Sequence, residues 1–205
     1  METDKINKSL RDKIIWLEFE PESIFNLSEL ANEYNVSRTP IKEALIHLQT
    51  EGWISGFGSR FMVTPLSLNR FREITEIRSV LEVQANIWAM NRLTPEELNA
   101  LEKIEKEGNG IETTMSNKEV AKVDFRFHRI LYDATKNSEL SKLLNQLLSH
   151  YIRFWLSVQR LVEPRMYYSD VHDIIQAVKN KDEEKLREAT FSHVKWAANK
   201  IMEYF

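Results

Sequence analysis

The chain has 205 residues, which is enough for one large domain or two small ones. Hydrophobic residues make up 42% and charged residues 29%, while only 5 Gly and 5 Pro argue against a turn-rich all-β protein. The absence of cysteine excludes disulfides, cysteine-ligated metal sites and cysteine nucleophiles. No stretch reaches about 18 uncharged apolar residues and the polar N-terminus lacks a signal-peptide pattern, so we expect a cytoplasmic protein outside the membrane.

The net charge is −3, and neither part of the chain is basic. Residues 1–67 carry 7 Lys and Arg against 10 Asp and Glu, and residues 68–205 carry 21 of each sign. A nucleic-acid-binding function must therefore depend on where individual cations lie, since bulk charge does not support it.

Residues 1–67 are predicted to form three short helices and a β-hairpin. A helix over roughly 4–17 carries an apolar stripe, and Asn26 with Glu29 forms a capping-box-like start for the second helix. Gly52 ends the third helix, and the alternating pattern of residues 53–65 indicates a hairpin. Two short helices joined by a tight turn before a hairpin are typical of a winged helix-turn-helix.

Residues 69–205 are predicted to be helical throughout, with six helices. Helix starts are marked by Thr94, Ser116 and Asn137 or Ser138, each followed by helix-forming residues. The fold class is therefore mainly α, with a winged helix-turn-helix before a helical bundle.

The third helix of the first part is the predicted DNA-reading element. In a helix-turn-helix, the N-terminal residues of the second helix meet base edges and phosphates in the major groove. Arg38 and Lys42 are four residues apart and share a face, Ser37 or Thr39 caps the helix, and Arg60 lies at the hairpin tip. The alternative is that these cations are ordinary surface charges on a helical hairpin.

Residues 35–45, with the sequence NVSRTPIKEAL, closely resemble the DNA-binding signature of the GntR family of bacterial transcription regulators. The resemblance implies that Arg38, Thr39 and Lys42 contact DNA, together with a glycine of the wing, best matched by Gly58. The family usually has arginine where this chain has Lys42, and lysine cannot pair bidentately with guanine. We therefore expect the contact of Lys42 to shift toward phosphate.

Histidines in the second part suggest a metal site. Asp124 and His128 are four residues apart on one helix, and His172 and His193 lie equally far from the predicted turn at 182–183. In an antiparallel helical hairpin these two histidines sit at the same height and could face each other. Three imidazoles and one carboxylate suit a divalent ion such as zinc, nickel or manganese. The alternative is that each histidine is a surface or hydrogen-bonded residue.

The same residues look like the metal-binding pattern of the FCD effector domain, found in the FadR-type branch of the GntR family, and residues 76–82 resemble its opening helix. The resemblance implies an antiparallel helical bundle that holds a metal and a small carboxylate effector. Arg78 is the candidate for the effector carboxylate, because guanidinium and carboxylate pair bidentately. A structural salt bridge from Arg78 to Glu82 is the alternative.

These observations predict a homodimeric transcription regulator, which we expect to be a repressor. Residues 1–67 would bind a double-stranded DNA operator, and residues 69–205 would sense a small carboxylate metabolite through a bound metal. The rival hypothesis is a metal-dependent enzyme that uses the Asp and three His residues. We do not expect an enzyme, because no general acid or nucleophile is evident and the winged-helix signature would be unexplained.

Overall fold

The computed structural model describes residues 2–57, 60–109, 115–158 and 164–203, and the chain divides into two compact units, Met1–Ser67 and Leu68–Phe205. Within these described ranges, none of the helices combines the length and the apolar character needed to cross a membrane.

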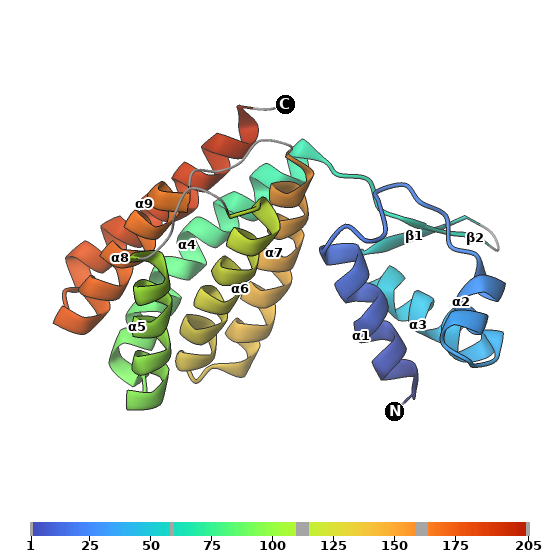
Figure 1. Ribbon diagram of the computed structural model, residues 1–205, viewed down its shortest axis with the longest axis horizontal. Helices are drawn as coiled ribbons and strands as arrows, with labels where there is room; N and C mark the ends of the chain where they lie inside the picture. Colours follow the sequence, from blue (N-terminus) through green and yellow to red (C-terminus); the bar gives the residue numbers. More distant parts are fainter. Residues whose placement is uncertain (1, 58–59, 110–114, 159–163, 204–205) are drawn as a thin grey trace. The chain divides into compact units, whose positions relative to one another are not determined.

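The first unit is a three-helix structure with a two-stranded wing (Figure 1). Its elements are α1 (Glu2–Ile15), α2 (Leu27–Glu33), α3 (Arg38–Thr50), β1 (Ile54–Phe57) and β2 (Arg60–Val63). Both α1 and α2 pack against α3. Leu10 and Ile14 of α1 are fully buried, as are Ile41 and Leu45 of α3, so the apolar stripes of these helices form the core.

Local signals fix where these helices begin and end. The side chain of Asn26 accepts hydrogen bonds from the backbone N–H groups of Ser28 and Glu29, as predicted for an N-cap. Asn35 has a φ of 53° in the tight turn before α3, a conformation that asparagine tolerates better than most residues. Gly52 has a φ of 78° just after α3, where glycine avoids the strain that a Cβ would cause.

The wing pairs with a segment that the sequence pattern did not reveal. β1 and β2 are antiparallel, with Ile54 opposite Val63. The extended residues 22–25 lie along β2, where the Phe25 N–H donates to the Phe61 carbonyl at 2.9 Å and the Val63 N–H to the Ser23 carbonyl at 2.9 Å. This pairing occupies the second edge of β2 and anchors the wing to the segment that leads into α2.

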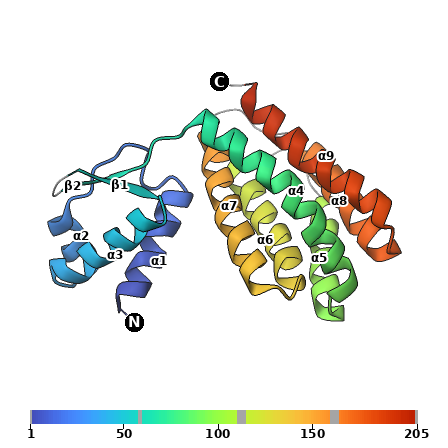
Figure 2. The ribbon, with the colours of Figure 1, turned by 180° about the vertical axis from the view of Figure 1, so that it is seen from behind.

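The second unit is a bundle of six helices among its described residues, as predicted. They are α4 (Leu68–Arg92), α5 (Pro95–Asn109), α6 (Asn117–Ala134), α7 (Ser138–Ser157), α8 (Pro164–Asn180) and α9 (Glu183–Met202). The long helix α4 packs against α6, α7 and α9, and Figure 2 shows it running between α7 and α9. The other packed pairs are α5 with α6 and α8, α6 with α7, and α8 with α9.

The predicted caps are present in this unit. The Thr94 hydroxyl accepts from the Glu97 N–H at 3.2 Å, Ser116 and Glu119 form a full capping box, and the Asn137 side chain accepts from the Leu140 N–H. The caps explain why the turns between helices fall where the sequence indicates, because each one satisfies backbone groups that the helix leaves unpaired.

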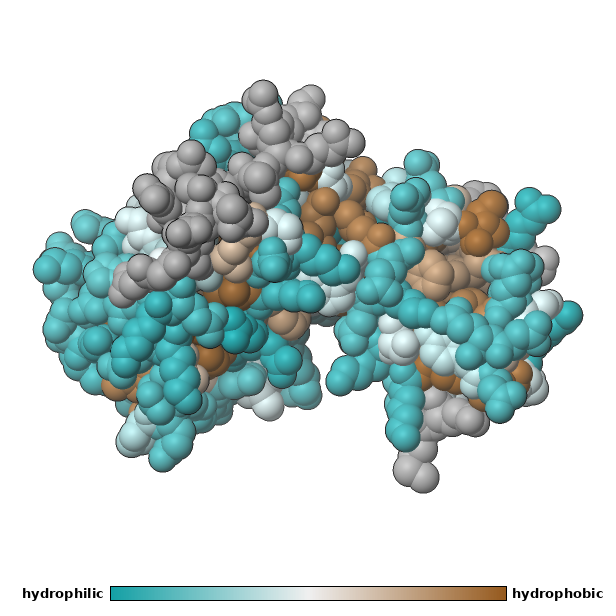
Figure 3. All heavy atoms as spheres, in the orientation of Figure 1, coloured by the Kyte–Doolittle hydropathy of each residue, from teal (hydrophilic) through white to brown (hydrophobic). Residues whose placement is uncertain are grey.

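Charged and polar residues cover most of the face of the helical unit seen in Figure 3. The interior of the helical unit holds several ionisable side chains, which proteins rarely bury without partners. Arg78, Glu82, Asp124, His128 and His193 are all at most 3% exposed.

Candidate functional site

The predicted DNA-reading residues lie on the outer face of α3. Four apolar side chains fix the orientation of this helix and are fully buried: Ile41, Ala44, Leu45 and Leu48. Arg38, Thr39 and Lys42 fall on the opposite side and are exposed. The arrangement leaves their polar groups available to a partner.

The N-terminus of α3 has no side-chain cap from Ser37, although Ser37 occupies the N-cap position. Of the two predicted caps, Ser37 or Thr39, the structure thus has Ser37 at the N-cap position but without a capping hydrogen bond, which leaves the first-turn N–H groups available to an acceptor such as a phosphate oxygen. Arg60 is exposed at the first position of β2. Gly58 lies outside the described residues.

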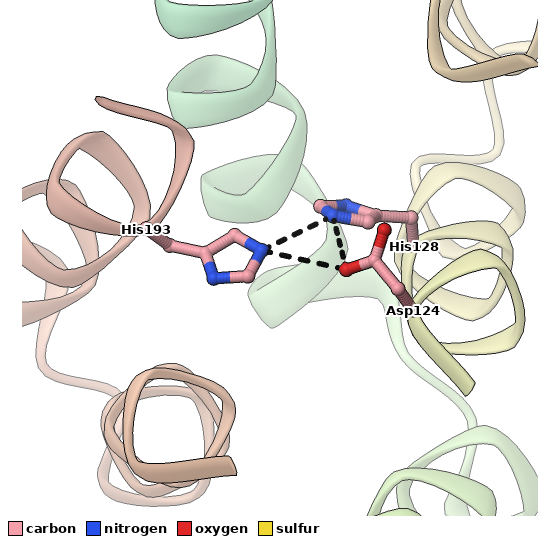
Figure 4. Close-up of side chains that lie close together, drawn as sticks. All are labelled: Asp124, His128 and His193. Atoms are coloured by element: carbon pink, nitrogen blue, oxygen red, sulfur yellow. Dashed lines mark hydrogen bonds and ion pairs between the residues drawn. The ribbon is translucent and has the colours of Figure 1, made fainter. Parts of the chain in front are cut away.

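The candidate metal centre lies inside the helical unit, where Asp124 and His128 of α6 meet His193 of α9 (Figure 4). Asp124 Oδ1 is 3.4 Å from His128 Nε2 and 3.7 Å from His193 Nε2, and the two Nε2 atoms are 3.3 Å apart. The structure thus brings together three of the four predicted ligands.

The three donor atoms fit a metal ion. Zinc bound to nitrogen and oxygen at about 2.0–2.2 Å in a tetrahedron places its ligand atoms about 3.3–3.6 Å apart. The observed spacings fall in or close to this range, so an ion could be held with little movement and one position left open. Two imidazoles and one carboxylate also suit other divalent ions.

The neighbouring histidines keep the Asp124 carboxylate ionised, which favours binding of a cation. Burial by itself raises the pKa of Asp124, but the neighbouring His128 and His193 outweigh burial and hold the pKa well below its usual value. Asp124 therefore stays ionised inside the bundle, and both of its oxygens lack a hydrogen-bond partner among the described residues. Its printed contacts to the two imidazoles are long, at 3.4 and 3.7 Å, so the carboxylate can still accept a cation between the rings.

A second polar layer from α4 lies behind His128. Glu82 accepts hydrogen bonds at Oε1 from Arg78 Nε at 2.5 Å and from the Tyr132 hydroxyl at 2.7 Å. Its other oxygen is 3.5 Å from His128 Nδ1. Burial raises the pKa of Glu82, but Arg78 and then His128 outweigh it, so the net shift is downward and Glu82 is ionised.

The structure therefore supports the salt-bridge alternative for Arg78. Its guanidinium is occupied at Nε by Glu82 and lies over the Tyr151 ring at 4.2 Å from the centroid. The buried Nη1 atom of Arg78 has no hydrogen-bond partner in the described part of the chain.

A series of aromatic side chains leads from Arg78 to His193, one of the candidate metal ligands. Tyr151 contacts Trp155, Trp155 contacts Tyr167, and Tyr167 contacts His193, with ring centroids 6.3, 6.0 and 5.9 Å apart. Within the described ranges, the hydroxyls of Tyr151 and Tyr167 and the indole N–H of Trp155 have no hydrogen-bond partner. Tyr167 thus borders His193, and the aromatic series that leads from it to Tyr151 carries polar groups that make no hydrogen bond of normal geometry.

The fourth predicted ligand, His172, lies elsewhere. Its side chain is 50% exposed, and its Nδ1 is 2.7 Å from Glu105 Oε1. The buried positions around it on α8 are Val171, Ile174 and Ile175. One helical position corresponds to a rotation of about 100°, so His172 points away from the face that Val171 presents to the interior. The spacing argument considered only the distance of His172 from the turn, and the rotation of α8 about its axis turns its side chain to the surface.

Two carboxylates near the cluster were not predicted to belong to it. Glu82 was considered only as a partner of Arg78, and Asp170, whose Oδ2 is 3.9 Å from His193 Nδ1, was not considered. The sequence gives only a weak signal for Asp170, because its place beside His193 depends on how α8 and α9 pack.

His150 is buried beside two cationic side chains, Arg70 and Arg153. Its Nε2 is 3.1 Å from an Nη atom of Arg70, which can only donate, so the ring accepts this hydrogen bond. Burial, with the nearby charges of Arg70 and Arg153, lowers the pKa of His150 to about 3. His150 is therefore neutral in the folded chain. His47, by contrast, is exposed on α3.

The neutral His150 predicts a loss of stability in mild acid. Because its pKa is about 3 when folded and about 6.5 when unfolded, the unfolded chain binds more protons between these values, and stability falls as pH falls. Between pH 7 and pH 5 this group should remove about 2 kcal/mol from the free energy of unfolding. Urea titrations of the wild type and His150→Gln should show that the variant loses less stability over this range. His47→Gln is the control, and an equal loss in His150→Gln would contradict the prediction.

The sequence of the chain matches two known protein families. The family model described as "Bacterial regulatory proteins, gntR family" matches residues 2–59, and the FCD domain matches residues 73–195, more than half of the chain. The chain is 30% identical over 190 residues to the Nta operon transcriptional regulator of Aminobacter aminovorans, covering 90% of this chain and 87% of that protein.

A second relative, the HTH-type transcriptional regulator McbR of Escherichia coli K12, is 25% identical over 162 residues, covering 77% of this chain and 73% of that protein. The solved structure titled E. coli McbR/YncC superposes with a TM-score of 0.87 at 21% identity, covering 99% of this chain and 98% of that one. This likeness supports the fold, a winged helix-turn-helix followed by a helical domain. On the sequence matches, the chain belongs to the GntR family of bacterial transcription regulators and carries an FCD domain.

Proposed function

We propose that the chain is a regulator whose affinity for its DNA operator is set by a small organic acid bound beside a divalent metal. The observation that carries the proposal is the buried set of Asp124, His128 and His193, whose donor spacing suits a metal ion. The metal would supply a Lewis-acidic site for a carboxylate oxygen. The unpaired donors beside it, on Arg78, Tyr151, Trp155 and Tyr167, would hold the remaining polar atoms of the acid.

We propose further that the chain acts in the cytoplasm as a homodimeric repressor on an operator with two half-sites. A winged helix-turn-helix reads one short half-site, and a two-fold operator is matched by a two-fold protein. An effector that changes the distance between the two reading helices would then weaken operator binding. The names of the relatives reported above are those of transcription regulators, and no observation favours the enzyme alternative.

Arg38 and Lys42 are expected to contribute differently to operator binding. Arg38→Ala should weaken specific binding by about 1–3 kcal/mol, the loss typical of a base-edge contact. Lys42→Ala should weaken binding on all sequences and reduce the salt dependence by about one charge, because a lysine contacts phosphate as a point charge. Fluorescence anisotropy at several salt concentrations measures both effects, with His47→Ala, also exposed on α3, as the control. Unchanged affinity in both variants would contradict the assignment of α3 as the reading helix.

The coupling between effector and DNA is the direct test of the proposed function. A ligand changes DNA affinity only by its differential affinity for two forms of the protein, and coupling is typically about 5–150-fold. We expect a small carboxylate to shift operator affinity by a factor in this range, and the operator to shift carboxylate affinity by the same factor. The effect should require the metal. Calorimetry of a panel of metabolic carboxylates with zinc-loaded protein, with and without operator, would measure it. Equal affinities in both states for every acid that binds would contradict the proposal.

A further inference from the structure

Each histidine of the candidate metal centre has a carboxylate behind it. The Nε2 atoms of His128 and His193 face each other and Asp124, which leaves the Nδ1 atoms directed away from the centre. His128 Nδ1 is 3.5 Å from Glu82 Oε2, and His193 Nδ1 is 3.9 Å from Asp170 Oδ2. The two carboxylates come from different helices, α4 and α8, and neither is among the donor atoms of the centre.

We propose that Glu82 and Asp170 are positioning residues that set the tautomer of the two histidines. A carboxylate that accepts the Nδ1–H bond holds the proton on Nδ1, which leaves the lone pair of Nε2 free for a metal and makes it more basic. The inference rests on the proposed metal-dependent function, and adds to it two residues that never touch the ion.

The surroundings of Glu82 suit this role. Its Oε1 is fixed by Arg78 and Tyr132, so the carboxylate is held in place. Its Oε2 has no hydrogen bond within the described ranges and points at His128. A 3.5 Å separation would need to shorten by about 0.5 Å to form a normal hydrogen bond, which a small rotation of the imidazole can supply when the metal fixes Nε2.

Asp170, the carboxylate near His193, is more exposed to solvent than Glu82. Its side chain is 28% exposed, and it lines a groove between α8 and α9 together with Asp173 and Ser192. The His193 side chain is only 4% exposed, so Asp170 lies between this buried candidate ligand and the solvent. Because Asp170 is half-buried and has no role in the apolar core, it can be replaced with little risk to the fold.

Metal affinity of the full-length protein provides the test. Zinc is titrated against a chromophoric chelator, and Asp170→Asn is expected to bind about 10–100-fold more weakly than the wild type. Asp173→Asn is the matched control, because it removes an exposed carboxylate from the same helix and groove, and it should bind as the wild type does. Asp170→Glu keeps the carboxylate and should recover most of the affinity. Glu82→Gln should weaken binding similarly, provided that circular dichroism shows it to be folded.

Long-range ¹H–¹⁵N NMR of the zinc-loaded protein separates a positioning role from a general structural one. The wild type should show His128 and His193 with the proton on Nδ1, and Asp170→Asn should perturb the signals of His193 while leaving those of His128. Wild-type affinity in Asp170→Asn and in folded Glu82→Gln would overturn this inference and leave the metal centre standing. A wild-type protein that binds no zinc would instead overturn the proposed function, and this inference with it.

Discussion

Replacing both His128 and His193 by alanine should abolish stoichiometric metal binding. The two imidazoles supply two of the three donor atoms that lie together, and Asp124 alone cannot hold an ion against water. The loss should exceed the roughly 10–100-fold effect expected for residues behind the ligands. The double variant also removes the close contact between two buried rings, so its folding should be checked by circular dichroism. Metal content after dialysis, measured by mass spectrometry, gives the result.

The matched control removes two histidines that the structure places elsewhere. His47→Ala/His172→Ala changes two exposed imidazoles and should keep a full equivalent of metal. This control also decides between two ligand sets, because the sequence spacing predicted His172 as a ligand and the structure does not bring it to the centre. Loss of metal in the control, or its retention in His128→Ala/His193→Ala, would contradict the three-residue centre.

The winged helix-turn-helix could be predicted from sequence because its signals are local. Capping residues, the turn at Asn35 and the apolar positions of α3 each act within a few residues. The pairing of residues 22–25 with β2 could not be predicted in this way. It joins segments about 38 residues apart, and residues 19–24 have neither clean alternation nor helical spacing.

In the candidate metal centre, too, the residues close in sequence could be placed and those on separate helices could be placed only in part. Asp124 and His128 are one helical turn apart, so their shared face follows from helix geometry alone. Placing His193 beside them required the hairpin of α8 and α9, which its turn signals located. Placing His172 correctly required the rotation of α8 about its axis. That rotation is set by which residues of α8 pack inward, among them Tyr167 and Val171, and an error of one position turns a ligand into a surface residue.

Arg78 is expected to be among the residues most costly to replace in the helical unit. It is 2% exposed and paired with Glu82, which is 0% exposed, so Arg78→Met would leave a carboxylate in the interior without its cation. Breaking a buried ion pair in this way typically costs about 3–5 kcal/mol. Guanidinium chloride unfolding of the wild type and variant would measure the change in the free energy of unfolding. Lys142→Met, which breaks the exposed Lys142–Glu139 pair, should leave stability unchanged.

A second variant separates the charge effect from the lost packing of the long Arg78 side chain. Arg78→Met/Glu82→Gln has no buried charge at this pair, and the glutamine carbonyl can still accept from the Tyr132 hydroxyl. The double variant should therefore regain most of the stability lost in Arg78→Met, because a buried pair and a neutral replacement of similar shape are often close in energy. If it is as unstable as Arg78→Met, the cost comes from packing against Tyr151. If both variants are as stable as the wild type, the buried Arg78–Glu82 pair makes no net contribution to stability, which would contradict this prediction.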